Sequence, residues 1–455
     1  MEIYYKILEN PYDFFNGHFI YRKGVNITTG SDSPYEEETR NGFWITRLDH
    51  IEEFYDKGTT LATINLPTDP DLEMTKHDNC WQLNKIIICE EYSLYDITTY
   101  EKFGLDILKN TSIVGFASRD NNINFLNWWL NSGLALRYDS TAIQNASEKG
   151  HVNILDWWLN SGLEVRYNSK AIYYASSRNH PNILDWWLNS GLELRYDDCA
   201  INWASGNGHI NVLDWWLKSG LELRYDQDTI NWASSDGHVN VLNWWLNSGL
   251  KLRYDKYAMN WASLRGHINV LDWWLNSGLE LRYDEHSMNW ASLNGHINVL
   301  DWWFNSGLEL RYDNETMQHA SSYGHTNVLN WWFNSGLELR YDDRPIEDAS
   351  ANGHINDLNW WLKSGLELKY NAKAIDGAIR GNKKESIKWW IKSGLDLKYT
   401  TDIIQWACER GHLDILELWY EMNLPFGSVK DALELASKNN HPGVIMWFQK
   451  NGFME

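Results

Sequence analysis

Ten of the fifteen histidines recur at one spacing, and a regular row of imidazoles could hold metal ions. They are His151, His180, His209, His238, His267, His296, His325, His354, His412 and His441. A shared zinc ion needs ligand nitrogens at about 2.0–2.1 Å, whereas packed helices of neighbouring repeats lie about 8–10 Å apart. We therefore interpret each imidazole as a group that bonds backbone at a turn. We expect no metal, no cofactor and no catalytic residue, since the P-loop, HExxH, GxSxG and kinase motifs are absent from the sequence.

Tryptophan pairs form a second regular row. They run from Trp128–Trp129 to Trp389–Trp390 and contain twenty of the tryptophans. Exposed indoles could stack on bases or sugars, but these lie on the apolar side of an expected helix. Each buried indole removes roughly 150–250 Å² from water. We therefore interpret the pairs as core packing.

Basic side chains form the third row, which runs from Arg137 to Arg340 and continues with Lys369 and Lys398. In most repeats a Glu lies two residues before the basic residue and an Asp lies two residues after it. This alternation indicates solvent-side ion pairs worth about 0–1 kcal/mol each, and a track for an acidic ligand is the alternative. One repeat lacks the histidine and gathers extra cations, which we interpret as a local patch: Arg380, Lys383, Lys384, Lys388 and Lys392.

One 29-residue unit carries all three rows, as in DCAINWASGNGHINVLDWWLKSGLELRYD, Asp198–Asp226. A fixed period of 20–50 residues indicates a stacked repeat whose units need neighbours to bury their apolar faces. With Asp198 as position 1, polar residues at 2, 5 and 9 and apolar or small ones at 3, 4, 6 and 7 predict a short amphipathic helix. Glycine at 11, or Asn179 or Asn440 in its place, suits a left-handed stop.

The second half of the unit is apolar except at positions 14, 17 and 21, which predicts a second helix enclosed by neighbours. Ser-Gly at positions 22 and 23 ends it. Bulky pairs on the second helix facing small residues on the first would make the stack wider on one side. We expect the first helices to line a concave face.

The first 110 residues lack the complete repeat. We predict a small α+β domain over 1–92, with strands at 43–46, 60–67 and 85–89, a helix at 48–58 and a surface loop over 21–38. A capping half-repeat follows at 93–110, because Gly104 lies 29 residues before Gly133. About twelve repeats then occupy 111–455, the last being a C-terminal cap.

Composition limits the classes of partner. The formal net charge of −21 argues against nucleic acid and anionic membrane as ligands. The four cysteines form no CxxC pair, which is typical of free thiols in a reducing compartment. No secretory leader or membrane span is evident. We expect a cytoplasmic monomer.

The stretch AINWASGNGHINVLDWWLKSG resembles the ankyrin repeat pattern TPLHxAAxxGHxxxVxxLLxxGA. Gly208–His209 match its GH pair, Trp215–Trp216 its apolar doublet and Gly220 its closing glycine. The resemblance implies a mostly α, ankyrin-type helix-turn-helix solenoid without the projecting β-turn finger, because four residues are absent between repeats. Short Trp-rich repeats behind a small leading domain resemble the ankyrin-repeat proteins of giant DNA viruses of amoebae, which implies host cytoplasm as the location.

The leading hypothesis is a non-enzymatic scaffold that binds a protein partner on the concave face. Positions 1, 2, 9 and 10 vary between units while packing positions hold, which leaves these positions available for specificity; neutral drift predicts the same variation. The candidate binding residues are Ser235, Asp236, Lys256, Tyr257, Leu264, Arg265, Glu285, His286, Ser322 and Tyr323. Two alternatives remain open: an enzyme in residues 1–92 to which the repeats bring substrate, and a structural component that associates with itself.

Overall fold

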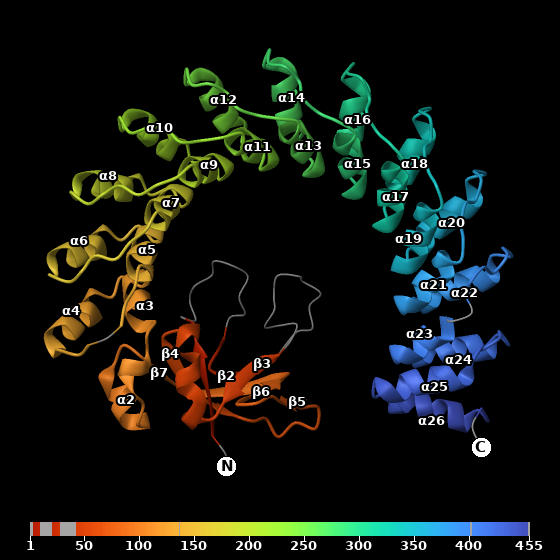
Figure 1. Ribbon diagram of the computed structural model, residues 1–455, viewed down its shortest axis with the longest axis horizontal. Helices are drawn as coiled ribbons and strands as arrows, with labels where there is room; N and C mark the ends of the chain where they lie inside the picture. The colour runs from red at the N-terminus through yellow and green to blue at the C-terminus, as the bar shows by residue number, and fades with distance from the viewer. Residues whose placement is uncertain (1–2, 10–20, 28–41, 136, 401–402, 454–455) are drawn as a thin grey trace. The chain divides into compact units, whose positions relative to one another are not determined.

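The computed structural model describes residues 3–9, 21–27, 42–135, 137–400 and 403–453 of the 455-residue chain. The described chain is mostly α-helical, and its strands lie within the first 93 residues (Figure 1). Two compact units are present, residues 1–204 with 211–225 and residues 205–210 with 226–455. Repeated helix pairs behind a small α+β segment confirm the expected fold class, a helix-turn-helix solenoid of ankyrin type.

Seven antiparallel strands form one sheet in the order β2-β7-β4-β1-β3-β6-β5. Their bounds are Tyr4–Leu8 (β1), Gly24–Ile27 (β2), Phe43–Thr46 (β3), Thr60–Asn65 (β4), Met74–Lys76 (β5), Cys80–Leu83 (β6) and Lys85–Ser93 (β7). Side chains alternate between the two faces of a strand. Phe43 and Ile45 of β3 therefore meet Ile86 and Ile88 of β7 in one apolar cluster.

The three predicted strands are confirmed as β3, β4 and β7, but the other four were missed. Strand β5, for example, is exposed throughout and pairs with β6, so no apolar alternation marks it. The predicted α-helix is a 3₁₀-helix, η1 (Leu48–Lys57), with Ile51 and Tyr55 buried. The loop expected over 21–38 begins with strand β2, and residues 28–38 lie outside the described residues.

The sheet joins the first helical elements through Glu52 of η1. These elements are α2 (Ile97–Phe103) and η2 (Ile107–Lys109). The Glu52 carboxylate accepts a hydrogen bond of 2.8 Å from the backbone N–H of Asp106, and it lies 2.6 Å from the Lys109 ammonium. The expected half-repeat thus forms one helix and a short 3₁₀ turn. The domain boundary near residue 92 stays a prediction.

Twelve helix pairs follow within the described residues. The first helices are α3 (Ile113–Arg119), α5 (Thr141–Glu148), α7 (Lys170–Ser177), α9 (Cys199–Gly206), α11 (Asp228–Ser235), α13 (Tyr257–Leu264), α15 (His286–Leu293), α17 (Glu315–Ser322), α19 (Arg344–Asn352), α21 (Lys373–Arg380), α23 (Ile403–Glu409) and α25 (Val429–Lys438). The second helices are α4 (Ile123–Ser132), α6 (Val152–Asn160), α8 (Pro181–Asn189), α10 (Ile210–Lys218), α12 (Val239–Asn247), α14 (Ile268–Asn276), α16 (Ile297–Asn305), α18 (Thr326–Asn334), α20 (Ile355–Lys363), α22 (Lys384–Lys392), α24 (Leu413–Glu421) and α26 (Pro442–Lys450).

The turn between the two helices of a pair requires both its glycine and its histidine. Gly237 has φ of 81°, and a Cβ there would lie 2.9 Å from Cε1 of His267 in the next repeat. The imidazole reaches back to the preceding repeat, as where Nε2 of His325 lies 3.0 Å from the carbonyl oxygen of Leu293. Partial burial lowers the pKa of His325, which favours the neutral ring. The interpretation of these histidines as structural groups is confirmed.

The two tryptophans of each pair have different environments. Trp274, the second of its pair, is 1% exposed, and its Nε1 donates to Oγ of Ser234 at 3.2 Å. Trp273, the first, is only half-buried and donates to Oδ1 of Asn243 at 2.9 Å. Both bonds join neighbouring repeats. The prediction of core packing is therefore right for the second indole and too broad for the first.

Packing between repeats is asymmetric in the second unit. The first helices α11, α13, α15, α17 and α19 pack closely in sequence, whereas the second helices α12, α14, α16, α18 and α20 make far fewer contacts with one another (Figure 1). Small residues on the first helices allow this close approach, while the indoles of the second helices keep that side apart. The first helices accordingly form the inner side of the curved row.

Candidate interaction surface

The accessible side of the first helices is formed by positions 2, 6 and 10. These positions are four residues apart, so their side chains share one side of a helix. We call this surface of the second unit the first-helix face. Its residues are Asp228, Trp232 and Asp236 of the α11 repeat, Tyr257, Trp261 and Arg265 of the α13 repeat, His286, Trp290 and Asn294 of the α15 repeat, and Glu315, His319 and Tyr323 of the α17 repeat.

The expected polar stripe at positions 2, 5 and 9 is wrong at position 5. Asn231 is 1% exposed and Asn260 is fully buried. The side-chain amide of Asn231 donates to Oδ1 of Asp255 at 2.9 Å, and the same oxygen accepts from the backbone N–H of Tyr257 at 2.9 Å. The Asp at position 29 therefore caps the following first helix. Both this Asp and the Glu at position 25 were expected to face the Arg at position 27. The Glu does so, as where Arg282 lies 2.6 Å from Glu280.

A row of aromatic rings occupies position 6, which was assigned to packing. Trp261 is partly buried and stacks on Tyr257 with a centroid distance of 5.1 Å and an interplanar angle of 26°. Trp290 lies 4.8 Å from the ring of His286. In the first unit, Trp203 at the same position is 40% exposed.

Sequence reasoning missed this row, although one signal was present. Position 6 is aromatic in five successive repeats, from Tyr174 to Trp290, but holds Asn145, His319, Asp348 and Gly377 in others. Position 7 of the same helices, which is buried, is by contrast Ala in every repeat. Variation of that kind is typical of a site that neighbouring repeats do not enclose.

The ten predicted residues lie at the ends of the first helices, and the structure brings several of them together. Arg265 Nη1 lies 2.7 Å from Oδ1 of Asp236, and Lys256 Nζ lies 2.6 Å from Oδ2 of Asp284. Glu285 lies 3.9 Å from Nδ1 of His286. These contacts place charged groups of neighbouring repeats in one row.

Position 9 contributes less to the surface than predicted. Ser235 is only 7% exposed, while Leu264 and Ser322 are partly buried, because this position turns toward the next repeat. The backbone carbonyl of Ser322 accepts from the amide of Asn352 at 2.9 Å. Tyr323 at position 10, by contrast, is 58% exposed. Ser235 is therefore corrected from a surface residue to a buried one.

One acidic group on this face, Asp284–Glu285–His286, has its ligand atoms within 4.8 Å of one another, as does Asp197–Asp198–Cys199 in the first unit. Burial alone would raise the pKa of Asp284, but bonds from Lys256, Asn260 and His286 lower it. The Asp284 carboxylate already accepts from the Asn260 amide at 2.6 Å. These hydrogen bonds and ion pairs account for the clustering of Asp284, Glu285 and His286 at the junction between two repeats.

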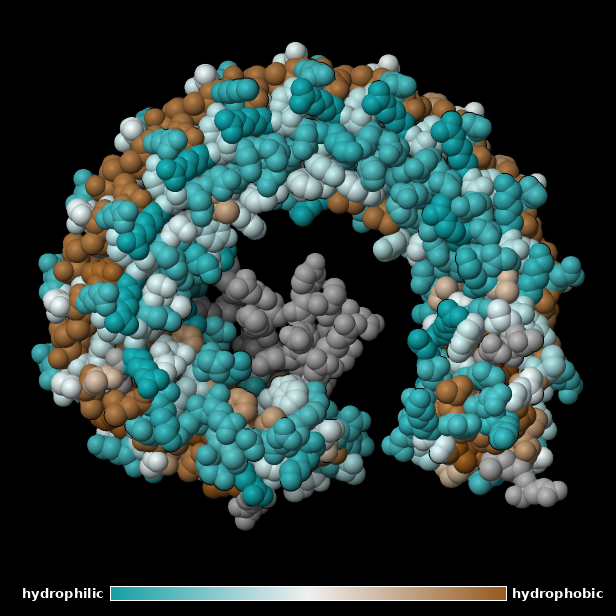
Figure 2. All heavy atoms as spheres, in the orientation of Figure 1, coloured by the Kyte–Doolittle hydropathy of each residue, from teal (hydrophilic) through white to brown (hydrophobic). Residues whose placement is uncertain are grey.

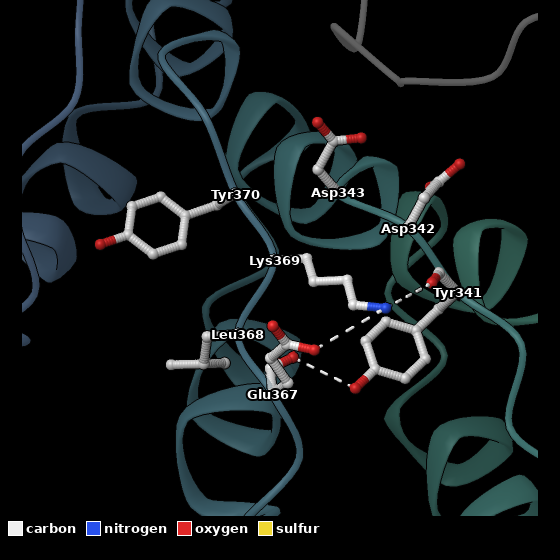
Figure 3. Close-up of a pocket in the computed structure, with 7 residues that line it drawn as sticks. All are labelled: Tyr341, Asp342, Asp343, Glu367, Leu368, Lys369 and Tyr370. Carbon is white, nitrogen blue, oxygen red and sulfur yellow. Dashed lines mark hydrogen bonds and ion pairs between the residues drawn. The ribbon is translucent and has the colours of Figure 1, made fainter.

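The basic residues of the third row lie on the loops that connect one repeat to the next, a surface that we call the loop edge. Their side chains bond neighbouring loop residues. Figure 3 shows one such place, a shallow depression of about 440 Å³ lined by Tyr341, Asp342, Asp343, Glu367, Leu368, Lys369 and Tyr370. Lys369 Nζ donates to the Tyr341 carbonyl at 3.4 Å and lies 3.9 Å from Glu367. The phenol of Tyr341 donates to the backbone carbonyl of Glu367 at 3.2 Å. The Lys369 ammonium is thus held by the residues that line this depression.

The outer side of the second helices carries an apolar row at position 20, which was expected to be enclosed. Leu246 and Leu275 are each 38% exposed, and Phe304 and Phe333 are each 45% exposed. In Figure 2, brown residues follow this side of the helix pairs. The ring of Phe304 packs 6.0 Å from Trp331 of the next repeat, so the row continues across repeats. Among the described residues, no helix has the length and apolar character needed to cross a bilayer.

Comparisons with known proteins give one curated relative and an ankyrin structure. No family model matches the chain. Over 108 residues, 24% of this chain, it is 39% identical to the uncharacterized protein L696 of Acanthamoeba polyphaga mimivirus, and the match covers 34% of that protein. The chain thus matches about a third of the relative's length. Among solved structures, the human ASB11 ankyrin repeat domain is similar with a TM-score of 0.34 and 13% identity, over 41% of this chain and 96% of that one. The mimivirus relative agrees with the resemblance to proteins of giant DNA viruses.

Proposed function

We propose that the chain is a non-enzymatic scaffold whose first-helix face binds a protein partner. The observation that supports this most directly is the row of partly exposed aromatic rings, Tyr257, Trp261, Trp290 and Tyr323, on helices whose Ala and Met side chains are buried. Tryptophan, tyrosine and arginine dominate the binding energy of protein interfaces. A face that presents these types beside carboxylates has the composition of an interface core with a polar rim.

Variation along the chain supports the same surface. Positions 2, 6 and 10 change residue type from repeat to repeat, whereas the buried position 7 is always Ala and the buried Ser and Trp positions change only in the last three repeats. Stacking requires identical packing at each junction, but recognition of a partner requires each repeat to present something different. The first-helix face is where the chain varies without loss of packing.

The viral setting is part of the proposal. Similarity to a mimivirus protein supports a viral protein that acts on host partners in the host cytoplasm. The small sheet domain is proposed to close the apolar end of the first helices, since Glu52 joins it to η2 and Arg119 of α3 lies 2.9 Å from Glu9. We propose that this chain works as a monomer with a protein ligand and without nucleic acid.

A second candidate function, self-association of a structural component, is favoured by the outer apolar row. Leu246, Leu275, Phe304 and Phe333 form a repeated ridge, and such exposed rows mark association sites in many proteins. Sedimentation of the full chain tests it. A dimer that forms as concentration rises, and that is lost when Phe304→Glu and Phe333→Glu are combined, supports this candidate. A monomer at all concentrations excludes it.

Affinity capture from expressing amoebae tests the leading proposal. The full chain is compared with Tyr323→Ala, which is exposed and should leave the free energy of unfolding within about ±0.5 kcal/mol. It is also compared with Tyr257→Ala, which loses the stacking on Trp261, worth about 0.5–1.5 kcal/mol. We expect both to reduce capture of the partner. The matched control is Leu275→Ala on the outer row. Partners that are kept by both tyrosine variants and lost with the control would place recognition on the second helices and overturn the proposal.

A further inference from the structure

One tryptophan of the position-6 row is already covered by a cation of the chain itself. Arg380, at position 9 of α21, places its guanidinium carbon 3.6 Å from the ring centroid of Trp406, at position 6 of α23. A guanidinium held over an indole face is attracted by the ring quadrupole, and Trp is the strongest of the aromatic partners. The first helices of neighbouring repeats thus form a binding position for one guanidinium, which we call a guanidinium seat.

The equivalent position in the middle of the second unit, beside Trp261, has no arginine of the preceding repeat to cover the indole. The residue equivalent to Arg380 beside Trp261 is Ser235, whose side chain is too short to cover an indole. Tyr257 stacks along Trp261 at 5.1 Å, which leaves the indole fixed in place. Other repeats hold longer side chains at the position of Ser235, namely Leu264 and Arg380.

Carboxylates lie on the same face as this seat. Asp236 follows Ser235, and Glu285 and Glu315 lie on the next two repeats of the same face. The two cations nearby are engaged, since Arg265 lies 2.7 Å from Asp236 and Lys256 lies 2.6 Å from Asp284. The face is therefore electronegative, in agreement with the formal charge of −21 of the whole chain.

The chain uses the same combination elsewhere. Arg282 lies 5.1 Å above the ring of Tyr254 and 2.6 Å from a carboxylate oxygen of Glu280, and other repeats have this arrangement at the loop edge. A planar guanidinium can stack on a ring and bond a carboxylate through its edge at the same time, whereas an ammonium cannot stack. An arginine suits such a site better than a lysine does.

We propose that the first-helix face around Trp261 binds an arginine-rich segment of a protein partner. One guanidinium lies on the Trp261 indole, as Arg380 lies on Trp406, and neighbouring arginines pair with Glu285 and Glu315. The inference rests on the proposed function and names the chemistry of its partner.

Labelled peptides test this partner chemistry. Fluorescein-labelled peptides of five Arg-Gly, five Lys-Gly or five Glu-Gly units are titrated with the full chain, and binding is measured by fluorescence anisotropy at physiological salt. We expect the arginine peptide to bind at least about threefold more tightly than the lysine peptide, given the added stacking on Trp261. Equal binding of these two peptides, or no binding of the arginine peptide, overturns the inference.

The change Ser235→Arg supplies the chain's own guanidinium over Trp261 and should weaken binding of the arginine peptide by about tenfold, the upper range for one cation–π contact. The change Trp261→Ala should have a similar effect. A thermal melt confirms that each variant is folded. If Trp261→Ala does not fold, Ser235→Arg alone decides, and unchanged binding to a folded Ser235→Arg chain overturns the inference.

A charge-matched pair separates this site from diffuse attraction to an acidic protein. Glu285→Gln with Glu315→Gln removes two charges from the face, and Glu309→Gln with Glu338→Gln removes two from the loop edge. We expect the first pair to weaken the arginine peptide at least about fivefold and the second to leave it nearly unchanged, since exposed charges separated by more than about 8 Å are largely screened. Equal losses mean non-specific attraction. Cellular capture that depends on Tyr323 without arginine-peptide binding would retain the proposed function and reject this inference.

Discussion

The indole Nε1 of Trp274 donates a hydrogen bond of 3.2 Å to Oγ of Ser234, forty residues earlier in the chain. Both side chains are buried, with exposures of 1% and 0%. The bond therefore joins the second helix of one repeat to the first helix of the preceding one. Successive repeats repeat this bond, as in Trp303 with Ser263 at 3.0 Å. The junctions from Trp158–Ser118 to Trp390–Ser350 share this polar link inside an apolar core, whereas Trp419 donates to the backbone carbonyl of Pro425.

Ser234→Ala should cost about 1–3 kcal/mol, because the buried indole N–H then has no partner. Trp274→Phe removes the donor and also creates a cavity, so its cost should be larger, about 2–4 kcal/mol. The double variant should cost less than the sum of the two. Urea unfolding of all four chains measures this coupling. Additive costs would show that the bond contributes nothing.

Glycines at positions 11 and 23 should differ in their tolerance of a side chain. Gly249 has φ of 75° with open space around it, so Gly249→Ala should cost only the strain of about 1–2 kcal/mol. Gly237 has φ of 81°, and its added Cβ would also meet the His267 ring at 2.9 Å. Gly237→Ala should therefore cost more. Equal losses of unfolding free energy in urea would contradict this comparison.

A β-branched residue at Gly249 should weaken one junction enough to separate the unfolding of the repeats on either side. Contacts in a repeat protein run mainly between neighbours, so a weak junction reduces cooperativity. Denaturant melts of Gly249→Val, followed by probes placed in repeats before and after it, should show two transitions. A single transition with an unchanged midpoint would argue against a linear stack.

Asp357 should make stability depend on pH with an unusual sign. Its carboxylate is fully buried where most repeats hold Val or Ile, accepts a hydrogen bond from Oγ1 of Thr326, and has no partner for Oδ2. Burial raises its pKa from 3.8 to about 6, although the Thr326 bond opposes this rise. The folded state therefore holds the proton more tightly than the unfolded state. Its contribution to stability is complete below about pH 4 and is lost as pH rises through 6, by about 3 kcal/mol.

The change Asp357→Val removes the buried charge and should raise stability at pH 7 by about 2–3 kcal/mol. The difference between the variant and the parent chain should shrink as pH falls from 7 to 4. Comparing the two chains at each pH cancels the titration of the other carboxylates. A difference that grows on acidification would contradict the assignment.

Glu52→Gln should loosen the contact of the sheet domain with the first helices. The carboxylate bonds the Asp106 N–H at 2.8 Å and the Lys109 ammonium at 2.6 Å, and its side chain is 20% exposed. Loss of the charge should cost about 1–2 kcal/mol and speed proteolysis near η2. The matched control is Asp56→Asn, because the Asp56–Lys57 pair is more than half exposed and should contribute little. Equal proteolysis of the two variants would remove Glu52 from this role.

Sequence alone determined the repeat, its two helices and its turn. The 29-residue spacing, glycine at position 11 and the Trp pairs define these features because each follows from local backbone geometry or from apolar periodicity. The structural role of the histidines was also predictable, since their spacing excludes a shared ion. The missed strands of the sheet, such as β5, depend on partners far away in the chain, and local pattern does not reveal them.

Only the tertiary structure decided which polar and aromatic residues are enclosed. Asn231 is polar but buried, because Asp255 of the following turn accepts its amide hydrogen. Trp261 is aromatic but partly open, because the neighbouring first helices do not enclose position 6. The sequence of one repeat does not show which of its residues the neighbouring repeats cover. Positions 5 and 6 differ in what the adjacent repeat packs against them. The candidate surface was therefore predictable at the ends of the first helices, but its aromatic centre was not.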